Sequence, residues 1–388
     1  MEPVTHILTG ACLSRSGLNR RAAYTTLAMA IGAEFPDIDT LWSLRGPVAS
    51  FQHHRGITHT FVGIPVEAAL IVAGVYLFHR WRSRSHDADV ATAAPVNWGL
   101  LYAFTLLALL SHLFLDFTNN YGVRPFFPFN PHWYAASIVF IFDPLIFALL
   151  LFALLLPSIF RLVSSEVGAR KQPFAARGFS LLALALIGSL YVLREVQHNR
   201  AQQLAMQQSV QALVVQAPVA VSALSTDSDA GLAPSEPPPV LLQAQRSLAN
   251  PDPFNPFRWY TVTDFGPFYQ LGLASTITGT ITPAQNLLQK LPESATLRAA
   301  EATQLGRAYL DWSPTPVITI TPVSELGLDD NGNRLSAGHT LVTFTDPRFM
   351  GEVPILHASG RTPLTGTVEL DAANHVVSEA MDGKQQRR

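Results

Sequence analysis

Long apolar stretches dominate the first half of the chain. Three of them reach the roughly 18 mostly apolar residues that a membrane-spanning helix needs. They run from Phe61 to Phe78, from Trp98 to Leu115 and from Ala136 to Phe160. A fourth stretch, from Phe179 to Leu193, is shorter and is equally typical of a buried helix. The pattern predicts an α-helical membrane bundle with about four long transmembrane helices.

Two shorter apolar stretches precede these segments. Val4 to Leu13 and Ala22 to Ala33 extend over only about half the thickness of a membrane. They fit helices that lie at the interface or pack on other helices, and they equally fit a pair of short helices that dip into the bundle. Irregular chain at that depth has to be buried in protein or line a wet cavity. We therefore expect short N-terminal helices beside the long ones.

The composition changes near Gln197. Beyond it a helical leader is expected, followed by a linker rich in Ala, Ser, Asp and Pro between Ala217 and Pro239. Further on, stretches such as PVITITPV and HTLVTFTD alternate or are β-branched, which is typical of strands. The pattern predicts a membrane-embedded domain at 1–196, a leader and linker at 197–250, and a small soluble, β-rich α+β domain with an antiparallel sheet at 251–388.

Composition narrows the choice of class. Charged residues make up 14% of the 388 residues, below the roughly 25% of an ordinary soluble domain. The net charge of −2 gives no general attraction to nucleic acid, so no nucleic-acid partner is expected. The single Cys12 excludes an intramolecular disulfide framework and a CxxC zinc knuckle. Any metal site must therefore use His, Asp and Glu.

Basic residues indicate how the chain is oriented. They gather after the first long segment and between the third and the fourth, whereas the loop between the second and the third has only Arg124. The residues concerned are Arg80, Arg82, Arg84, Arg161, Arg170, Lys171 and Arg177. The positive-inside rule places the two basic loops in the cytoplasm and the C-terminal domain outside it. The N-terminus lacks the features of a cleavable signal peptide, so internal segments are expected to target the chain.

The second long segment ends with SHLFLDFTNNYG. Its His112 and Asp116 are four residues apart, so on a helix they share one face. An imidazole and a carboxylate inside an apolar helix are costly unless they are paired or functional. One interpretation is a structural pair that locks two helices. The favoured one is a pair of metal ligands, because the rest of the chain supplies more ligands of the same kind.

Two carboxylates follow a helix end in GAEFPDIDTLW. Pro36 ends the preceding helix, which places Asp37 and Asp39 on the loop beyond it. Carboxylates at this spacing bind one cation or bridge two. The alternative is that one of them caps the following turn. Glu34 is a candidate ligand or catalytic base.

FQHHRGITHT gathers imidazoles just before an apolar segment. His54 and His59 are five residues apart, and Gly56 between them permits the turn that brings both to one point. Neutral imidazole is the commonest protein ligand of metals. Arg55 has a planar fork suited to phosphate or carboxylate, and the alternative is a side chain that snorkels to the interface. His53 is a third ligand, a supporting partner or a bystander.

Three further residues stand out in apolar surroundings. His6 in PVTHILTG is alone on a short helix, where a packed histidine is commoner than a ligand. Asp143 in IVFIFDPLIF needs a partner, so it is expected to face the bundle interior, and Pro144 is expected to break that helix. Glu67 is a weaker case of the same kind.

Taken in order, TH, PDID, HRGITH, HxxxD before a Tyr-Gly turn, and FDP form a set. Over residues 1 to 195 the chain resembles the YdjM family of bacterial inner-membrane proteins, described as metal-dependent hydrolases. The HxxxD helix is distantly similar to that of zinc-dependent phospholipases C, which implies a phosphodiester substrate. The resemblance implies a multi-pass protein of the bacterial inner membrane that binds a catalytic metal. The ligands it implies are His6, Asp37, Asp39, His54, His59, His112 and Asp116.

The expected function is a membrane-bound metal-dependent hydrolase of a lipid or lipid-linked phosphodiester. Ligation without thiolate suits Zn²⁺, and also Mn²⁺ or Fe²⁺. The candidate ligands exceed the three that one catalytic zinc uses, so one or two ions are expected. Glu34 would act as a base and Arg55 would neutralise an anionic headgroup. The alternatives are an ion, proton or solute transporter, and a scaffold that metal stabilises for the C-terminal domain.

Overall fold

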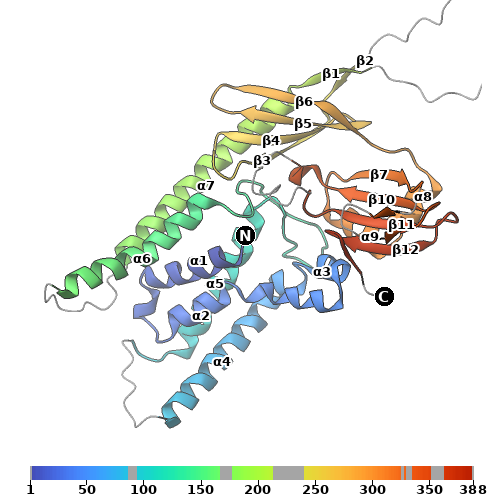
Figure 1. The fold of residues 1–388 in the computed structure, drawn as a ribbon. Coiled ribbons are helices and arrows are strands. Elements are labelled where there is room, and N and C mark those ends of the chain that lie inside the picture. The colour runs from blue at the N-terminus through green and yellow to red at the C-terminus, as the bar shows by residue number, and fades with distance from the viewer. Residues whose placement is uncertain are drawn as a thin grey trace, which may run out of the picture.

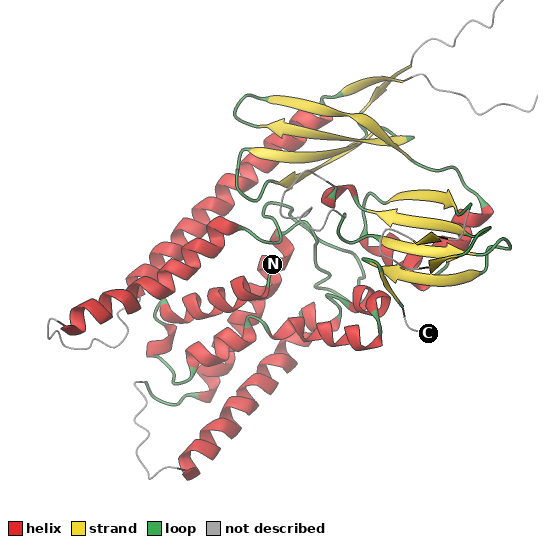
Figure 2. Cartoon of the chain, in the orientation of Figure 1, coloured by secondary structure: helices red, strands yellow, loops and turns green. Residues whose placement is uncertain are grey.

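The computed structural model describes residues 2–85, 94–166, 177–212, 240–324, 327–328, 334–350 and 362–386. The first half is helical and most of the second is made of strands (Figure 2). The helices of the first half are α1 Pro3–Arg15, α2 Thr25–Gly32, α3 Pro47–His53, α4 Gly63–Ser85, α5 Trp98–Thr118, α6 Pro144–Glu166 and α7 Arg177–Met206, with the 3₁₀ helices η1 Leu18–Arg20, η2 Phe35–Arg45 and η3 Ile57–His59.

Three of the described helices are long and apolar enough to cross a membrane. They are Gly63–Ser83 in α4, Trp98–Thr118 in α5 and Arg177–Met206 in α7. The prediction of about four long spans is therefore not confirmed, because α6 contributes only a shorter apolar helix, Pro144–Phe160. The uncertain fourth stretch of the sequence proves to be part of α7, one of the three.

The start of α6 differs from the prediction. The Asp143 carboxylate accepts hydrogen bonds from the backbone N–H groups of Leu145 and Ile146, at 3.0 and 3.1 Å. Pro144 follows at the first helical position, where its fixed φ favours a helix and its missing N–H costs nothing. The pair thus begins a helix. The predictions that the helix starts at Ala136 and that Pro144 interrupts it are wrong.

Asp143 also has the partner that its surroundings require. Its carboxylate lies 2.7 Å from the Arg194 guanidinium of α7, and both side chains are fully buried. Arg194 Nη1 donates to the backbone carbonyl of Asp252 as well, at 3.4 Å. The ion pair thus joins α6 to α7, and the hydrogen bond joins α7 to Asp252 in the C-terminal half of the chain.

The short N-terminal helices pack inside the bundle. α1 contacts α2, α5, α6 and α7. Gly10 of α1 lies so close to α2 that a Cβ there would stand 2.3 Å from the backbone oxygen of Met29. Both short helices pack against longer ones, which fits either of the two expectations for these stretches.

The first sheet lies over the C-terminal end of α7 (Figure 1). It is antiparallel with the order β3-β4-β5-β6. Its strands are β3 Arg246–Pro251, β4 Arg258–Asp264, β5 Phe268–Ser275 and β6 Thr280–Gln289, and a separate ribbon pairs β1 Ser209–Ala212 with β2 Val240–Gln243. Trp259 of β4 and Ala201 of α7 share a buried cluster, so the sheet rests directly on the helix.

The second sheet is antiparallel with the order β13-β12-β11-β10-β7. Its strands are β7 Val317–Pro322, β10 Thr340–Thr345, β11 Gly366–Leu370, β12 Val376–Met381 and β13 Lys384–Gln385; α8 Ala295–Glu301, α9 Gln304–Trp312, η4 Pro347–Phe349 and the hairpin of β8 Gly327–Leu328 with β9 Arg334–Leu335 accompany them. The expected β-rich C-terminal part is confirmed, with two antiparallel sheets.

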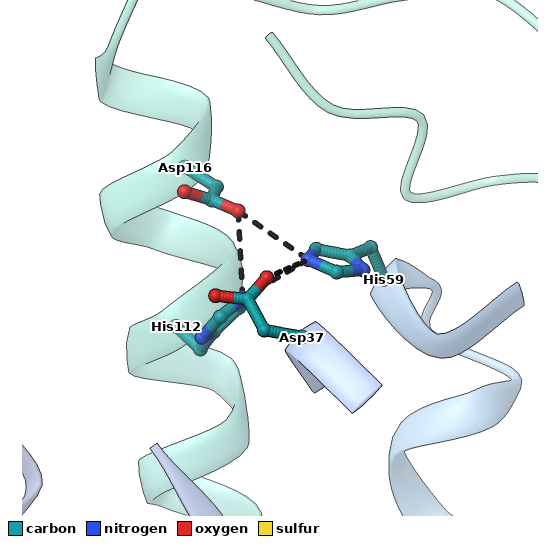
Figure 3. A group of neighbouring side chains, drawn as sticks. All are labelled: Asp37, His59, His112 and Asp116. Carbon is teal, nitrogen blue, oxygen red and sulfur yellow. Dashed lines mark hydrogen bonds and ion pairs between the residues drawn. The ribbon is translucent and has the colours of Figure 1, made fainter. Parts of the chain in front are cut away.

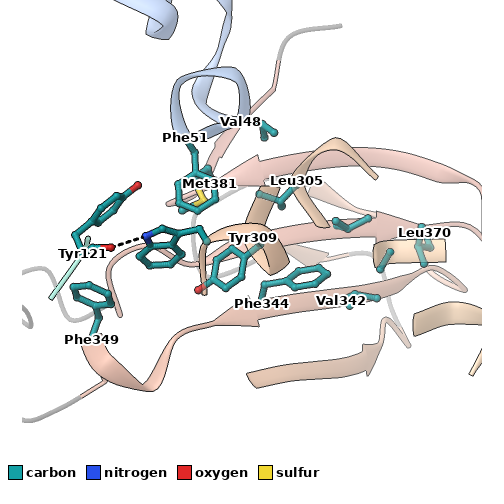
Figure 4. Packing of buried hydrophobic residues seen from close by; sticks show 13 residues of the cluster. Val48, Phe51, Tyr121, Leu305, Tyr309, Val342, Phe344, Phe349, Leu370 and Met381 are labelled. Carbon is teal, nitrogen blue, oxygen red and sulfur yellow. Dashed lines mark hydrogen bonds between the residues drawn. The ribbon is translucent and has the colours of Figure 1, made fainter. Parts of the chain in front are cut away.

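The second sheet and the bundle share one hydrophobic core (Figure 4). Val48 and Phe51 of α3 and Tyr121 after α5 belong to the same buried cluster as Tyr309 and Trp312 of α9. Two hydrogen bonds cross the same boundary. Trp312 Nε1 donates to the Tyr121 carbonyl at 3.1 Å, and Arg348 Nη1 donates to the Asn120 carbonyl at 2.7 Å.

The division into domains at 196 and 250 stays a prediction. α7 continues across residue 196, and β2 and most of β3 lie within the range assigned to the leader and linker. The part of the predicted linker between Ala217 and Pro239 lies outside the described residues.

Candidate metal centre

Four side chains converge beside the C-terminal end of α5. One ligand atom from each of Asp37, His59, His112 and Asp116 lies within 4.8 Å of the others (Figure 3). His112 and Asp116 come from one face of α5, as their spacing predicts. Asp37 comes from η2, and His59 ends η3. Three elements distant in sequence thus meet at one point.

The distances suit a single small cation. A tetrahedral ion with bonds of about 2.1 Å sets its ligand atoms roughly 3.4 Å apart. His59 Nε2 lies 3.2 Å from Asp37 Oδ1 and 3.4 Å from Asp116 Oδ2. His112 Nε2 lies 3.7 and 3.4 Å from the same two oxygens. These separations bracket the tetrahedral value.

The imidazole nitrogens give a second argument for a cation. His112 Nδ1 lies 2.7 Å from the Ala33 carbonyl oxygen, which only accepts hydrogen bonds. Nδ1 therefore carries the proton, and in the neutral ring Nε2 presents a lone pair. That lone pair faces two carboxylates and, at 3.0 Å, the Nε2 of His59. Either a proton on His59 Nε2 or a bound cation in its place would relieve the repulsion in this arrangement.

Asp39 supports the centre from outside the group of four. Its Oδ2 lies 3.4 Å from His59 Nδ1, on the side of the ring away from the other ligand atoms. It also accepts the backbone N–H of Arg55 at 2.6 Å, and its Oδ1 lies 3.3 Å from His54 Nδ1. A carboxylate behind a metal-binding imidazole fixes the ring and increases its basicity.

His54 and His6 also lie beside the group and outside it. The His54 side chain is 30% exposed and is held by Asp39. His6 of α1 is buried, stacks on the His112 ring with centroids 3.9 Å apart, and has Nε2 3.5 Å from Asp116 Oδ1. Direct ligation by His6, Asp39 and His54 stays a prediction, as does a second ion.

Arg55 lies behind the ligands, where it touches Asp116. It is 4% exposed, and its Nη2 donates to Asp116 Oδ1 at 2.7 Å, so Oδ2 is the oxygen that faces the two histidines. Its Nη1 donates to the Gly122 carbonyl at 2.6 Å. The backbone of Arg55 has φ +53, so this residue, and not Gly56, takes the left-handed conformation in the turn. Contact with an anionic headgroup stays a prediction for this side chain.

Glu34 lies at the wall of a cavity of about 460 Å³, beside Asp37. Apolar side chains form most of the remaining wall, among them Ile7 of α1 and Ile31 of α2. Burial and the Asp37 carboxylate raise the pKa of Glu34 to about 8. The carboxyl group therefore lies close to the centre, in apolar surroundings that favour its protonated form.

The field at the centre is negative. Burial would lower the pKa of His59, but hydrogen bonds to Asp116 and Asp37 outweigh it and raise the pKa to about 9. Burial would raise the pKa of Asp37, but its hydrogen bond with His59 and the nearby imidazoles hold that pKa below the usual range. The field that keeps a proton on His59 also attracts a divalent cation.

Two supporting residues were not identified from sequence. Asn119 Oδ1 accepts the backbone N–H of Tyr121 at 2.8 Å and lies 3.4 Å from Arg55 Nη1. The Tyr121 ring lies 4.7 Å from the Arg55 guanidinium and 5.4 Å from the His54 ring. The polar turn TNNYG just after HxxxD is the signal that marks them, since it follows the helix that carries His112 and Asp116.

The fold and the centre together indicate an integral membrane protein with a largely buried group of His and Asp side chains that could hold a metal ion. The profile of the family described as YdjM inner membrane protein matches residues 1–201, which is more than half of the chain. The chain belongs to this family.

Among curated proteins, the uncharacterized protein YfhP of Bacillus subtilis (strain 168) is 30% identical over 158 residues. The match covers 38% of this chain and 43% of YfhP, so it spans less than half of that relative. No solved structure matches significantly.

Proposed function

We propose that the protein is a membrane-bound metal-dependent hydrolase that acts on a lipid or lipid-linked phosphodiester. The observation that carries the proposal is the group of Asp37, His59, His112 and Asp116, whose ligand atoms all lie within 4.8 Å of one another and whose imidazole–carboxylate separations are 3.2 to 3.7 Å. Zinc suits this donor set best, and manganese or iron is the alternative. When bound, such an ion supplies a Lewis acid and lowers the pKa of water toward about 7.

Residues of the chain would orient the metal ligands and transfer the proton. Asp39 and the Ala33 carbonyl hold the two imidazoles with their Nε2 atoms turned inward. Arg55 holds Asp116 in place. Hydrolysis of a phosphodiester forms a P–O bond to water, breaks the P–O bond to the leaving alcohol and moves one proton from the water to that alcohol. Glu34, at the cavity wall beside Asp37, is the carboxyl group placed to relay this proton.

The cavity beside Glu34 supports a lipid as the substrate. Ile7, Ile31 and Ile38 line it and remain exposed on the outer surface of the protein. In a membrane-embedded bundle such a surface faces the acyl chains of the bilayer. An acyl chain in this cavity would place its polar end at Asp37 and Glu34.

The orientation of the helices supports an extracytoplasmic C-terminal half. The C-terminal end of α4, with Arg80 and Arg82, and the N-terminal end of α7, with Arg177, lie at the end of the bundle away from both sheets (Figure 1). By the positive-inside rule that end is cytoplasmic. The sheets and the metal centre then belong to the opposite side of the inner membrane.

The first test measures metal by mass spectrometry in detergent-purified full-length protein. We expect one equivalent of transition metal in the wild type and loss of it in His112→Ala, with folding checked by circular dichroism. The control is His375→Ala, because this side chain is 80% exposed and far from the centre in sequence. Wild-type protein that takes up no metal on reconstitution would refute the proposal.

The second test incubates metal-loaded protein with labelled phospholipids and follows product release. Release that His112→Ala abolishes and His375→Ala leaves intact supports hydrolysis. A loaded protein that releases nothing from any lipid class, but unfolds when chelated, would favour the scaffold alternative instead. The core shared by α3 and the second sheet is the observation behind that alternative.

A further inference from the structure

A second cavity, of about 660 Å³, adjoins the metal centre. Asp39 and Ile38 line it, whereas Asp37 and Ile38 line the apolar cavity beside Glu34. The PDID segment of η2 therefore separates the two cavities. Asp39, which lines the second cavity, contacts the Nδ1 side of His59. The His59 ring therefore lies between this part of the wall and the other ligand atoms.

The second cavity differs from the first in its charge. Arg45, His53 and Arg124 line it, together with Trp42. Trp42 organises two of them, since the His53 ring stacks on it at 3.9 Å and the Arg45 guanidinium lies 4.8 Å from its centroid. Arg45, His53 and Arg124 thus all present basic side chains to the same cavity.

Arg124 is a buried cation with donor capacity left over. It is 8% exposed, and its guanidinium lies between the rings of Phe127 and Trp133, at 5.0 and 4.6 Å from their centroids. Its Nη1 pairs with Asp311 at 3.2 Å and its Nη2 donates to the Gln52 carbonyl at 3.1 Å. Its Nε is buried and has no hydrogen-bond partner within the described parts of the chain.

The acidic groups nearby do not neutralise this cavity. Asp39 is engaged by the Arg55 backbone N–H and by two imidazoles, and Asp311 is engaged by Arg124. Arg45 has no carboxylate partner within the described residues. The cavity thus keeps a positive charge beside a negative metal centre, which is the electrostatic pattern of an anion site.

We propose that this cavity binds the phosphate of an amphiphile whose apolar chain occupies the cavity beside Glu34. The inference rests on the proposed function and deepens it, because it assigns the two ends of the substrate to the two sides of the PDID segment. Arg45 and Arg124 bind the phosphate oxygens, and His53 and Trp42 form the floor of the subsite. The ester bond of the amphiphile would then lie at the PDID segment, beside the candidate ligand Asp37.

The test measures binding without turnover. Isothermal titration calorimetry is carried out on detergent-purified, metal-loaded full-length protein. The probe is the phosphonate analogue of the phosphodiester dihexanoyl phosphatidylglycerol, in which a P–C bond replaces the P–O bond to the diacylglycerol. Inorganic phosphate tests the anion alone, and dihexanoylglycerol tests the chains alone. The variants are Arg45→Gln and Arg124→Gln, and the control is Arg298→Gln, whose side chain is 65% exposed on α8.

We expect the phosphonate lipid to bind more tightly than either inorganic phosphate or dihexanoylglycerol. A hydrogen bond to a charged group is worth enough that Arg45→Gln should weaken lipid binding roughly ten-fold or more, while Arg298→Gln leaves it unchanged. Arg45 is exposed, so its variant should fold even if Arg124→Gln does not.

Several outcomes overturn the inference. Lipid binding that is the same in wild type, Arg45→Gln and Arg124→Gln excludes the subsite. Inorganic phosphate binding as tightly as the phosphonate lipid excludes a lipid as the source of the anion. The fate of the proposed function is separate. If lipid binding depends on Arg45 but no lipid is hydrolysed, the subsite is retained and the hydrolase is rejected. If lipids are hydrolysed equally well by wild type, Arg45→Gln and Arg124→Gln, the hydrolase is retained and the subsite is rejected.

Discussion

Replacement of Asp39 by asparagine separates a metal ligand from the residue that supports one. Asp39→Asn keeps the size of the side chain and an oxygen that can accept the Arg55 N–H, now at 2.6 Å. It removes the charge that faces His59 Nδ1 at 3.4 Å. Loss of such an outer carboxylate typically costs 10- to 100-fold in metal affinity. This corresponds to about 1.4–2.8 kcal/mol of binding free energy.

The assay is competition for Zn²⁺ between the detergent-purified protein and a chromophoric chelator. We expect Asp39→Asn to lose about 10- to 100-fold in affinity. Asp37→Asn, which removes one of the four converging ligand atoms, should lose substantially more. Asp371→Asn is the control, because its carboxylate lies at an exposed turn. If Asp39→Asn and Asp37→Asn lose affinity equally, Asp39 is a ligand and the reasoning from geometry is refuted.

Three further predictions concern stability, measured by thermal unfolding in detergent. Trp312→Ala should destabilise the protein by about 3–5 kcal/mol, since it empties the shared core, and a loss no larger than that of Trp312→Phe would contradict this packing. Arg194→Met should cost about 3–5 kcal/mol because it leaves Asp143 buried and unpaired. The double variant with Asp143→Leu should recover most of that loss, and a double variant as unstable as the single one argues against the pair. Gly10→Ala should cost about 1–3 kcal/mol because α1 and α2 would have to separate, whereas Gly188→Ala, with open space around its Cβ position, serves as the control and should change little.

Local rules predicted the parts of the centre that lie on one element. The spacing of His112 and Asp116 places both on one face of a helix, and the structure puts both in the group of four. Asp37 does follow a helix end, but the predicted loop is wrong: α2 ends at Gly32, and Pro36 begins the 3₁₀ helix η2, which carries both Asp37 and Asp39. The sequence also indicated that Asp143 needs a buried partner, although nothing local could name Arg194, which lies on a different helix.

The division of labour among the polar residues depends on tertiary structure. Asp37 and Asp39 are equivalent in sequence, but η2 turns Asp37 toward the centre and Asp39 toward the back of the His59 ring. Arg55 is a residue type that often binds anionic substrates, yet its side chain contacts Asp116 and a backbone carbonyl. On a 3₁₀ helix two residues that are two positions apart point in different directions, but the sequence pattern predicted a loop here, so spacing alone did not specify these directions.

The core shared by the two halves of the molecule affects when α3 can reach its final packing during synthesis of the protein. α3 leads into the turn that holds His59, and its Val48 N–H donates to the Gln386 side chain at 2.9 Å. Gln386 Nε2 also donates to the Arg45 carbonyl at 2.7 Å. A ribosome must therefore translate almost the whole of this chain before α3 acquires these partners. A product truncated before α9 would lack the Tyr309 and Trp312 side chains that cover Phe51 and Tyr121.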